Sequence, residues 1–147
     1  MSNPNLLVVD DHPDTLRLFE TFLSLAGFAV TTATGAAKAL DHVATGHVDA
    51  VATDLAMPGM DGFELIRRLR SAAGQRPVPI VAITGQAINV AQVLPSDIGC
   101  CRLLLKPCDL AELGQLLHFL VVSCEHDCER CSNRIPPMPG AAGESSK

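Results

Sequence analysis

Four runs of apolar residues in this chain are each followed by a polar residue that could take part in chemistry. If these runs are parallel strands of one sheet, their carboxyl ends lie at one edge, and the polar side chains meet there. Each polar residue alone could simply cap a helix or face solvent, but that explanation does not account for the whole set. The set consists of Asp10 with Asp11, Asp54, Thr84 and Lys106.

Three carboxylates in one pocket repel one another, by about 4 kcal/mol for two charges about 4 Å apart at an effective dielectric constant of about 20. A cation must offset this repulsion. The hard oxygen ligands, with no His or Cys expected in the cluster, favour Mg²⁺. Together with the ammonium group of Lys106, this ion would stabilise the charge that develops when a carboxylate attacks a phosphoryl group. Asp54 is the best-placed nucleophile, so we expect it to accept the phosphoryl group.

The hydrophobic pattern alternates between short β-rich runs and longer amphipathic segments, as in repeated strand-helix units. Right-handed connections between such units give an α/β fold, a parallel sheet with helices on both faces. The fourth helix is short and stops before Pro95, so we expect a mobile or distorted element there. The expected strands span residues 5–9, 28–33, 49–53, 78–83 and 102–105, and the expected helices span residues 14–26, 35–44, 63–73, 86–94 and 109–122.

Local signals mark several of the expected helix ends. Gly27, Gly46 and Gly74 suit left-handed C-terminal caps. Asp109 can cap the last helix together with Glu112, three positions further on. We expect one apolar face of that helix to be buried, formed by Leu110, Leu113, Leu117 and Leu120.

Composition limits the partners and the location of the protein. Apolar residues make up 48% of the 147 residues and aromatic residues only 3%, so the core of a single domain must consist of Val, Leu, Ile and Ala. The net charge of −5 and the scattered Lys and Arg residues argue against direct binding of nucleic acid. No signal peptide is visible and no apolar run approaches the roughly 20 residues that span a bilayer, so we expect a cytoplasmic protein without membrane insertion.

The six cysteines are unevenly spaced, which favours free thiols or a metal site over a disulfide framework. We expect the folded domain over residues 1–122 and a separate tail over residues 123–147, with a disordered Pro-, Gly- and Ser-rich end from residue 132. Three other cysteines flank the last expected strand and should fill small apolar spaces; they are Cys100, Cys101 and Cys108.

The tail contains a cluster whose spacing lies within the range for zinc, but it lacks the second separated pair of ordinary structural sites. A metal site and a solvated tail with free thiols both remain open. The cluster consists of Cys124, His126, Cys128 and Cys131.

Residues 5 to about 121 resemble the receiver domains of bacterial response regulators. The resemblance implies a flavodoxin-like fold with five parallel strands in the order 2-1-3-4-5. The motifs that carry it are Val8-Val9-Asp10-Asp11-His12, Asp54-Leu55-Ala56-Met57-Pro58-Gly59-Met60-Asp61-Gly62, Ile83-Thr84-Gly85 and Lys106-Pro107.

The resemblance also implies a role for each site residue. Asp54 would be the phosphoacceptor, and Asp10 and Asp11 would hold Mg²⁺, with Asp11 as the direct ligand. Asp54 itself and the main-chain carbonyl of Ala56 would complete the protein ligands. Thr84 resembles the switch hydroxyl that turns toward the phosphoryl group, and Lys106 resembles the cation that pairs with it. The phosphoryl donor would be a histidine kinase or a histidine phosphotransfer protein.

Three positions near the site need separate interpretation. Receivers usually carry an aromatic residue at the position of Leu103, so the route by which the signal leaves the site differs here. Gly85 replaces the common Ala after the switch residue, which keeps the pocket open and loosens the backbone. We interpret His12 as a surface residue at the start of the first helix rather than as a catalytic base.

The expected function is that of a single-domain response regulator that signals to a downstream protein through phosphorylation-dependent contacts, because no output domain follows residue 122. It would be a phosphoacceptor with slow self-dephosphorylation, not an enzyme. An alternative is a pseudo-receiver that acts as a constitutive protein-interaction module with a metal-binding tail. A hydrolase with a nucleophilic aspartate would usually need a second acidic residue two positions after Asp54, where Ala56 stands.

Overall fold

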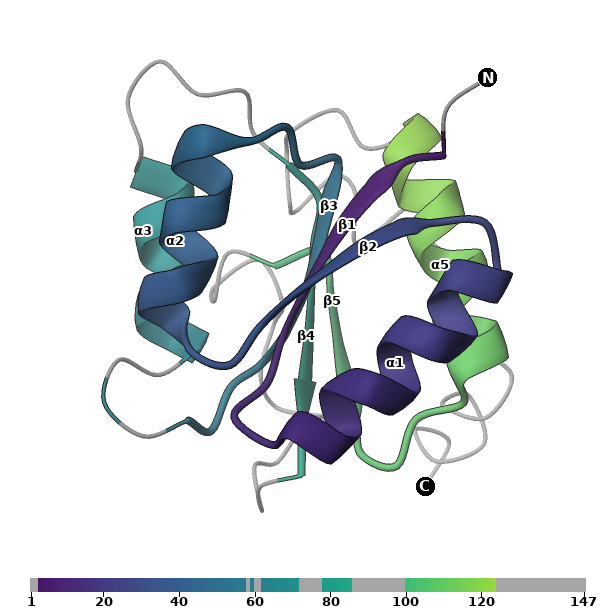
Figure 1. Ribbon diagram of the computed structural model, residues 1–147, viewed down its shortest axis with the longest axis horizontal. Coiled ribbons are helices and arrows are strands. Elements are labelled where there is room, and N and C mark those ends of the chain that lie inside the picture. The colour runs from purple at the N-terminus through teal and green to yellow at the C-terminus, as the bar shows by residue number, and fades with distance from the viewer. Residues whose placement is uncertain (1–2, 58, 60–61, 72–77, 86–99, 124–147) are drawn as a thin grey trace.

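One parallel sheet forms the centre of the protein, with its strands in the expected order β2-β1-β3-β4-β5 (Figure 1). The computed structural model describes residues 3–57, 59, 62–71, 78–85 and 100–123. The strands are β1 (Asn5–Val9), β2 (Ala29–Ala33), β3 (Ala50–Asp54), β4 (Ile80–Thr84) and β5 (Arg102–Leu105). The described helices are α1 (Pro13–Leu25), α2 (Ala36–Thr45), α3 (Gly62–Ser71) and α5 (Leu110–Ser123).

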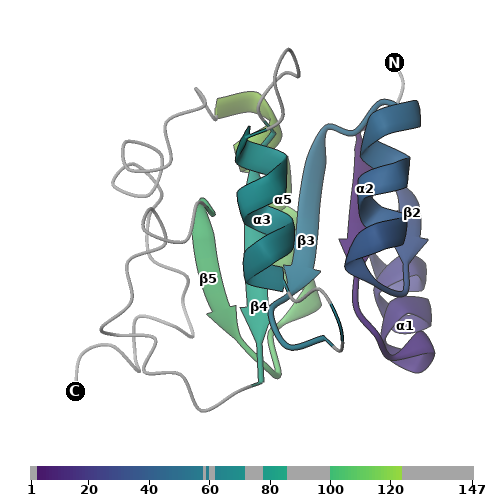
Figure 2. The ribbon, with the colours of Figure 1, turned by 90° about the vertical axis from the view of Figure 1, so that its left-hand side faces the viewer.

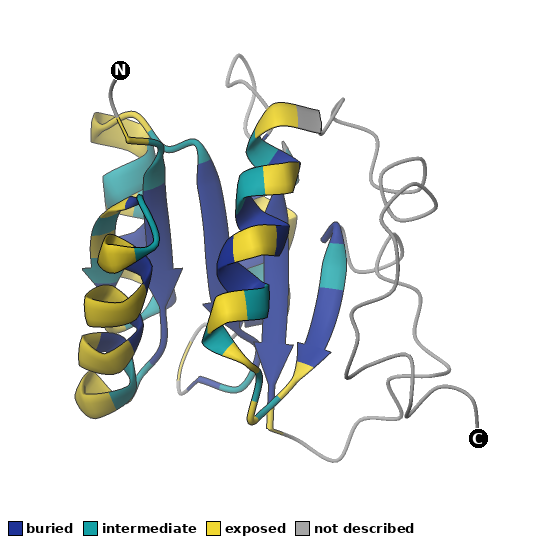
Figure 3. Cartoon of the chain, turned by 90° about the vertical axis from the view of Figure 1, so that its right-hand side faces the viewer, coloured by how far each residue is buried: buried dark blue, intermediate teal, exposed yellow. Residues whose placement is uncertain are grey.

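The helices cover both faces of the sheet, with α1 and α5 on one face and α2 and α3 on the other (Figures 1 and 2). Successive side chains of a strand point to opposite faces, and β1 follows this rule closely. Leu6 and Val8 join the apolar cluster under α1 and α5, while Leu7 and Val9 join the cluster under α2 and α3. Burial on both sides explains why β1, β3 and β4 read as almost continuous apolar runs (Figure 3).

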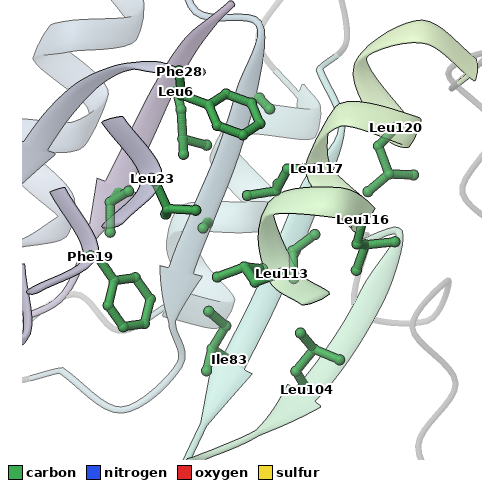
Figure 4. Packing of buried hydrophobic residues seen from close by; sticks show 14 of the residues in the cluster. Leu6, Phe19, Leu23, Phe28, Ile83, Leu104, Leu113, Leu116, Leu117 and Leu120 are labelled. Atoms are coloured by element: carbon green, nitrogen blue, oxygen red, sulfur yellow. The ribbon is translucent and has the colours of Figure 1, made fainter. Parts of the chain in front are cut away.

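Helical periodicity explains the packing under α1 and α5 (Figure 4). In α1 the buried residues Leu16, Phe19 and Leu23 are three and four positions apart and therefore lie on one face. The expected buried face of α5 is largely confirmed. Its buried leucines are Leu113, Leu116, Leu117 and Leu120, and Leu110 is only partly buried at the edge of the cluster.

The strand predictions for residues 5–9 and 102–105 match the structure, and the other strands begin one or two residues later than expected. Pro79 has no N–H group to donate, although its carbonyl accepts a hydrogen bond from Val51 N at 3.0 Å. This accounts for the start of β4 at Ile80. At the other end, Asp54 and Thr84 are the last residues of β3 and β4 and still belong to the ladder.

Two of the predicted helix ends are confirmed and one is wrong. Gly27, directly after the C-cap of α1, has a φ of 105°, as a left-handed cap requires. Asp109 caps α5, since its Oδ1 accepts hydrogen bonds from Ala111 N at 2.8 Å and Glu112 N at 3.2 Å. Gly46 ends α2 with an extended backbone (φ −130°, ψ 177°), because its N–H already bonds the carbonyl of His42 without any left-handed turn.

Several predictions fall outside the described residues. They are the helix over residues 86–94, the cap at Gly74, and the tail cluster of Cys124, His126, Cys128 and Cys131. None of the helices that the structure describes is both long enough and apolar enough to cross a bilayer.

Candidate functional site

The parallel register brings the expected site residues to one edge of the sheet. Val9 pairs with Thr53, Asp54 with Ile83, and Thr84 with Leu105. Asp10, Asp54, Thr84 and Lys106 therefore lie at the carboxyl ends of four neighbouring strands, as the sequence predicts. The β4 and β5 ends are joined further by a hydrogen bond from Lys106 N to Thr84 O at 2.8 Å, and Thr84 is fully buried.

Lys106 connects two carboxylates that lie far apart in the sequence. Its Nζ is 2.8 Å from Asp10 Oδ2 and 3.4 Å from Asp54 Oδ2. Asp10 and Asp54 are only 3% and 6% exposed, whereas the Lys106 side chain is 28% exposed. Two carboxylates at this depth need a compensating positive charge, and the lysine supplies one.

The pKa values of Asp10 and Lys106 are shifted by this contact. Burial alone would raise the pKa of Asp10, but hydrogen bonds from Lys106 and the His12 main chain outweigh burial and hold this pKa below its ordinary value of 3.8. Burial likewise opposes the charged form of Lys106. The hydrogen bond and charge of Asp10, followed by those of Asp54, outweigh burial and raise the pKa of Lys106 above 10.5.

A measurable pH dependence follows from the lowered pKa of Asp10. A carboxyl with a lower pKa in the folded state adds stability above its unfolded pKa, and this contribution is lost as the pH falls through the folded pKa. In metal-free buffer, the free energy of unfolding of the wild type should therefore fall relative to that of Asp10→Asn as the pH drops below 3.8. Urea unfolding at about pH 7, 5 and 3 measures this difference.

Asp41→Asn serves as the control for this pH series, because Asp41 is an exposed residue of α2. We expect the Asp41→Asn curve to follow the wild type at every pH. Parallel curves for the wild type and Asp10→Asn would contradict the assigned role of the Lys106 contact.

Hydrogen bonds from neighbouring residues hold both the side chain and the main chain of Asp54. Ala56 N donates to Asp54 Oδ1 at 3.2 Å, and the buried hydroxyl of Thr53 donates to the main-chain oxygen of Asp54 at 2.9 Å. Gly62, the first residue of α3, donates its N–H to Leu55 O at 3.0 Å. A Cβ at position 62 would lie 2.1 Å from Asp54 O, so only glycine permits this approach.

Asp10 and Asp11 differ in how their oxygens are used. Both oxygens of Asp10 have partners, since Oδ2 bonds Lys106 and Oδ1 accepts the His12 N–H at 2.9 Å. Asp11 Oδ1 is buried, yet it accepts no hydrogen bond from the residues that the structure describes. Buried carboxylate oxygens that lack donors suit a hard divalent cation, so the acidic pair is compatible with Mg²⁺ and Asp11 is its more open member.

The structure corrects one expectation about this cluster. We expected no His or Cys near the carboxylates, but Nδ1 of His12 lies 3.2 Å from Asp10 Oδ1 and 3.1 Å from Asp11 Oδ1. Donor atoms of all three residues lie within 4.8 Å of one another. His12 is an exposed residue at the start of α1, as expected, but its imidazole turns back toward the acidic pair.

The residues around β5 behave mostly as predicted. Leu103, at the position of the usual aromatic residue, is buried in the cluster under α2 and α3. Cys100 and Cys101 are fully buried in the two apolar clusters, which confirms them as small core residues. Cys108 is half-buried at the edge of the α1 and α5 cluster, and burial raises the pKa of its thiol.

Sequence reasoning missed the contacts that His12 and Thr53 make in the site. It placed Gly62 in the loop motif after Asp54, directly before an expected helix, but did not predict how closely Gly62 approaches Asp54. Thr53 gave no signal, because a threonine inside a strand is common.

Comparisons with known proteins agree with this geometry. The family model described as the response regulator receiver domain matches residues 6–118. The sensor protein EvgS of Escherichia coli K12 is 33% identical over 136 residues, which cover 88% of this chain and 11% of EvgS. The transcriptional regulatory protein PrrA of Mycobacterium leprae is 36% identical over 113 residues, which cover 77% of this chain and 48% of PrrA.

Among solved structures, the chemotaxis response regulator CheY4 of Vibrio cholerae superposes with a TM-score of 0.72 at 25% identity, covering 81% of this chain and 99% of that one. The chain belongs to the response regulator receiver family, the receiving component of two-component signalling systems. It spans less than half the length of the two curated relatives named above.

Proposed function

We propose that this protein accepts a phosphoryl group on Asp54 from a histidine kinase or a histidine phosphotransfer protein. The observation that carries the proposal is the contact of Lys106 Nζ with both Asp10 and Asp54, which joins the acceptor carboxylate, one member of the acidic pair and a fixed cation at one edge of the sheet. Phosphoryl transfer requires mainly positioning and charge neutralisation, and these groups supply both.

In the proposed reaction, a carboxylate oxygen of Asp54 attacks the phosphorus of a phosphohistidine. A P–O bond to Asp54 forms as the P–N bond to the donor imidazole breaks, and the imidazole leaves with the electron pair. Lys106, whose Nζ lies 3.4 Å from Asp54 Oδ2, stabilises the charge that develops on the phosphoryl oxygens, and the Ala56 N–H holds Asp54 in place. The buried Thr84 supplies the hydroxyl that would then turn toward the phosphoryl group.

The same edge would hold Mg²⁺. We assign its ligands as the side chains of Asp10, Asp11 and Asp54 and the carbonyl of Ala56, with Asp11 as the direct ligand of the acidic pair. Once bound, the ion would add positive charge beside the transferring phosphoryl group. The buried, hydrogen-bond-free Oδ1 of Asp11 supports this assignment.

The phosphorylated protein would act through protein contacts in the cytoplasm. A phosphoryl group adds about −2 of charge at pH 7, enough to change the packing of neighbouring elements. We expect the change to reach the surface around β5 and α5, with Leu103 in place of the usual aromatic residue. The acceptor reacts once per phosphoryl group and is not an enzyme, although water would slowly hydrolyse the acyl phosphate. The intact pocket favours this function over a constitutive interaction module.

Intact mass spectrometry after incubation with acetyl phosphate tests the proposal. The wild type in Mg²⁺ should gain the mass of one phosphoryl group, and addition of EDTA should prevent this gain. Asp54→Asn should gain nothing, whereas Asp41→Asn, a matched change at an exposed carboxylate of α2, should react like the wild type. An adduct that persists in Asp54→Asn, or none in the wild type, would refute the proposed function.

A further inference from the structure

His12 places a nitrogen atom next to the two carboxylates that follow β1. Its Nδ1 is hydrogen-bonded to Asp10 Oδ1 at 3.2 Å and lies 3.1 Å from Asp11 Oδ1. The contact with Asp11 lacks hydrogen-bond geometry, so the buried Oδ1 of Asp11 stays without a donor among the described residues. His12 Nδ1 and Asp11 Oδ1 are therefore close neighbours that do not hydrogen-bond to each other.

The backbone around His12 fixes this arrangement. His12 is the N-cap residue of α1, with an extended backbone (φ −103°, ψ 113°), and Pro13 follows it at the first helical position. Its N–H is bonded to Asp10 Oδ1, which ties the residue to the end of β1. The His12 side chain makes no capping hydrogen bond. The imidazole is held instead by the hydrogen bond between its Nδ1 and Asp10 Oδ1, beside the acidic pair.

The spacing of these atoms matches that of metal ligands. Neighbouring ligands of an octahedral ion with bonds of about 2.1 Å are about 3.0 Å apart. The separation of 3.1 Å between His12 Nδ1 and Asp11 Oδ1 is close to that value. Asp10 is less open to an ion, because both of its oxygens already accept hydrogen bonds.

We propose that His12 Nδ1 exchanges its hydrogen bond to Asp10 Oδ1 for a bond to the divalent ion held by Asp11, with the imidazole proton then on Nε2. This nitrogen shifts the metal preference of the site from Mg²⁺ toward first-row transition-metal ions. The inference rests on the proposed metal-assisted function. An all-oxygen set suits Mg²⁺, whereas an imidazole nitrogen raises the affinity for transition-metal ions more than for Mg²⁺.

Mn²⁺ is the probe for this proposal, because it is paramagnetic and, as a hard ion, binds thiols such as those of the cysteines weakly. Electron spin-echo spectroscopy of Mn²⁺ bound to the full chain should show coupling to one directly bound ¹⁴N nucleus. The coupling should disappear in His12→Ala. It should remain in His47→Ala, a matched control at an exposed histidine that contacts Asp49 at 2.7 Å.

Affinities provide the second readout. In calorimetric titrations, His12→Ala should lower the ratio of Mn²⁺ to Mg²⁺ affinity on the order of tenfold, and Asp11→Asn should weaken both ions. The His12 side chain is 69% exposed and makes no capping bond, so its removal should not unfold the chain. Mn²⁺ bound without nitrogen coupling, or an affinity ratio unchanged by His12→Ala, would overturn the proposal.

The phosphoryl adduct of the wild type in Mg²⁺ reports separately on the proposed function. If the adduct forms without ¹⁴N coupling to Mn²⁺, only the role of His12 fails. If the coupling is present and lost in His12→Ala but no adduct forms, the phosphoacceptor function fails and the nitrogen ligand stands.

Discussion

Lys106→Met should slow phosphoryl transfer to Asp54 by about 10² to 10³-fold, the usual cost of losing one group that stabilises a developing negative charge. Lys106 Nζ lies 3.4 Å from Asp54 Oδ2 and supplies a positive charge beside the acceptor oxygen. Methionine keeps much of the apolar stem while removing the charge. The rate of mass gain with acetyl phosphate in Mg²⁺ measures this effect directly.

Lys38→Met is the matched control, because Lys38 is an exposed lysine of α2 on a different part of the surface. It should react at the wild-type rate. Circular dichroism should show Lys106→Met folded, since Asp10 keeps its hydrogen bond from the His12 N–H. A folded Lys106→Met that reacts as fast as the wild type would remove Lys106 from the reaction.

Gly62→Ala should have an effect of comparable size through a different cause. The added Cβ would lie 2.1 Å from Asp54 O and 2.7 Å from Leu55 Cα, distances that real structures do not tolerate. Both atoms belong to the main chain, so the start of α3 or the end of β3 must move. A displacement of about 1 Å at a reacting group can cost about 100-fold in rate, and we expect a loss of that order.

The same change should reduce stability by about 1 to 3 kcal/mol, as overpacked substitutions commonly do. Urea unfolding gives this cost, and the transfer rate is then compared under conditions where both proteins are fully folded. Gly35→Ala is the control, because a Cβ at that N-cap position meets nothing within 4 Å and its backbone is extended. A folded Gly62→Ala with a wild-type rate would show that the loop tolerates the displacement without moving Asp54.

Much of the fold could be predicted from the sequence, because β1, β3 and β4 are short, apolar and buried on both faces. The limits of β1 and β5 match those predicted from the apolar runs alone. The exact ends of β3 and β4 did not, since whether Asp54 and Thr84 belong to the ladder depends on pairing with the neighbouring strand. The prediction of a left-handed cap at Gly46 was wrong for a similar reason. A glycine after a helix is compatible with several backbone conformations, and tertiary context selects one.

The composition of the candidate site was predictable, but its contacts were not. Polar residues after four strands imply one shared edge, and the structure places them there. The contact of Lys106 with both Asp10 and Asp54 depends on the rotamer of the lysine side chain, which residue type alone does not determine. The turn of His12 toward Asp11 depends on the conformation between β1 and α1. The close approach of Gly62 to Asp54 joins the start of α3 to the end of β3, and a glycine before an expected helix does not by itself predict such a contact.

Chemical mapping of the phosphorylated residue tests the central claim most directly. Borohydride reduces an aspartyl phosphate to homoserine, which remains in the chain as a permanent record of the acceptor. After treatment with acetyl phosphate and Mg²⁺, peptide sequencing by mass spectrometry should find homoserine at position 54 and at no other aspartate. Homoserine at Asp10, Asp11 or another position, or none at all, would contradict the account.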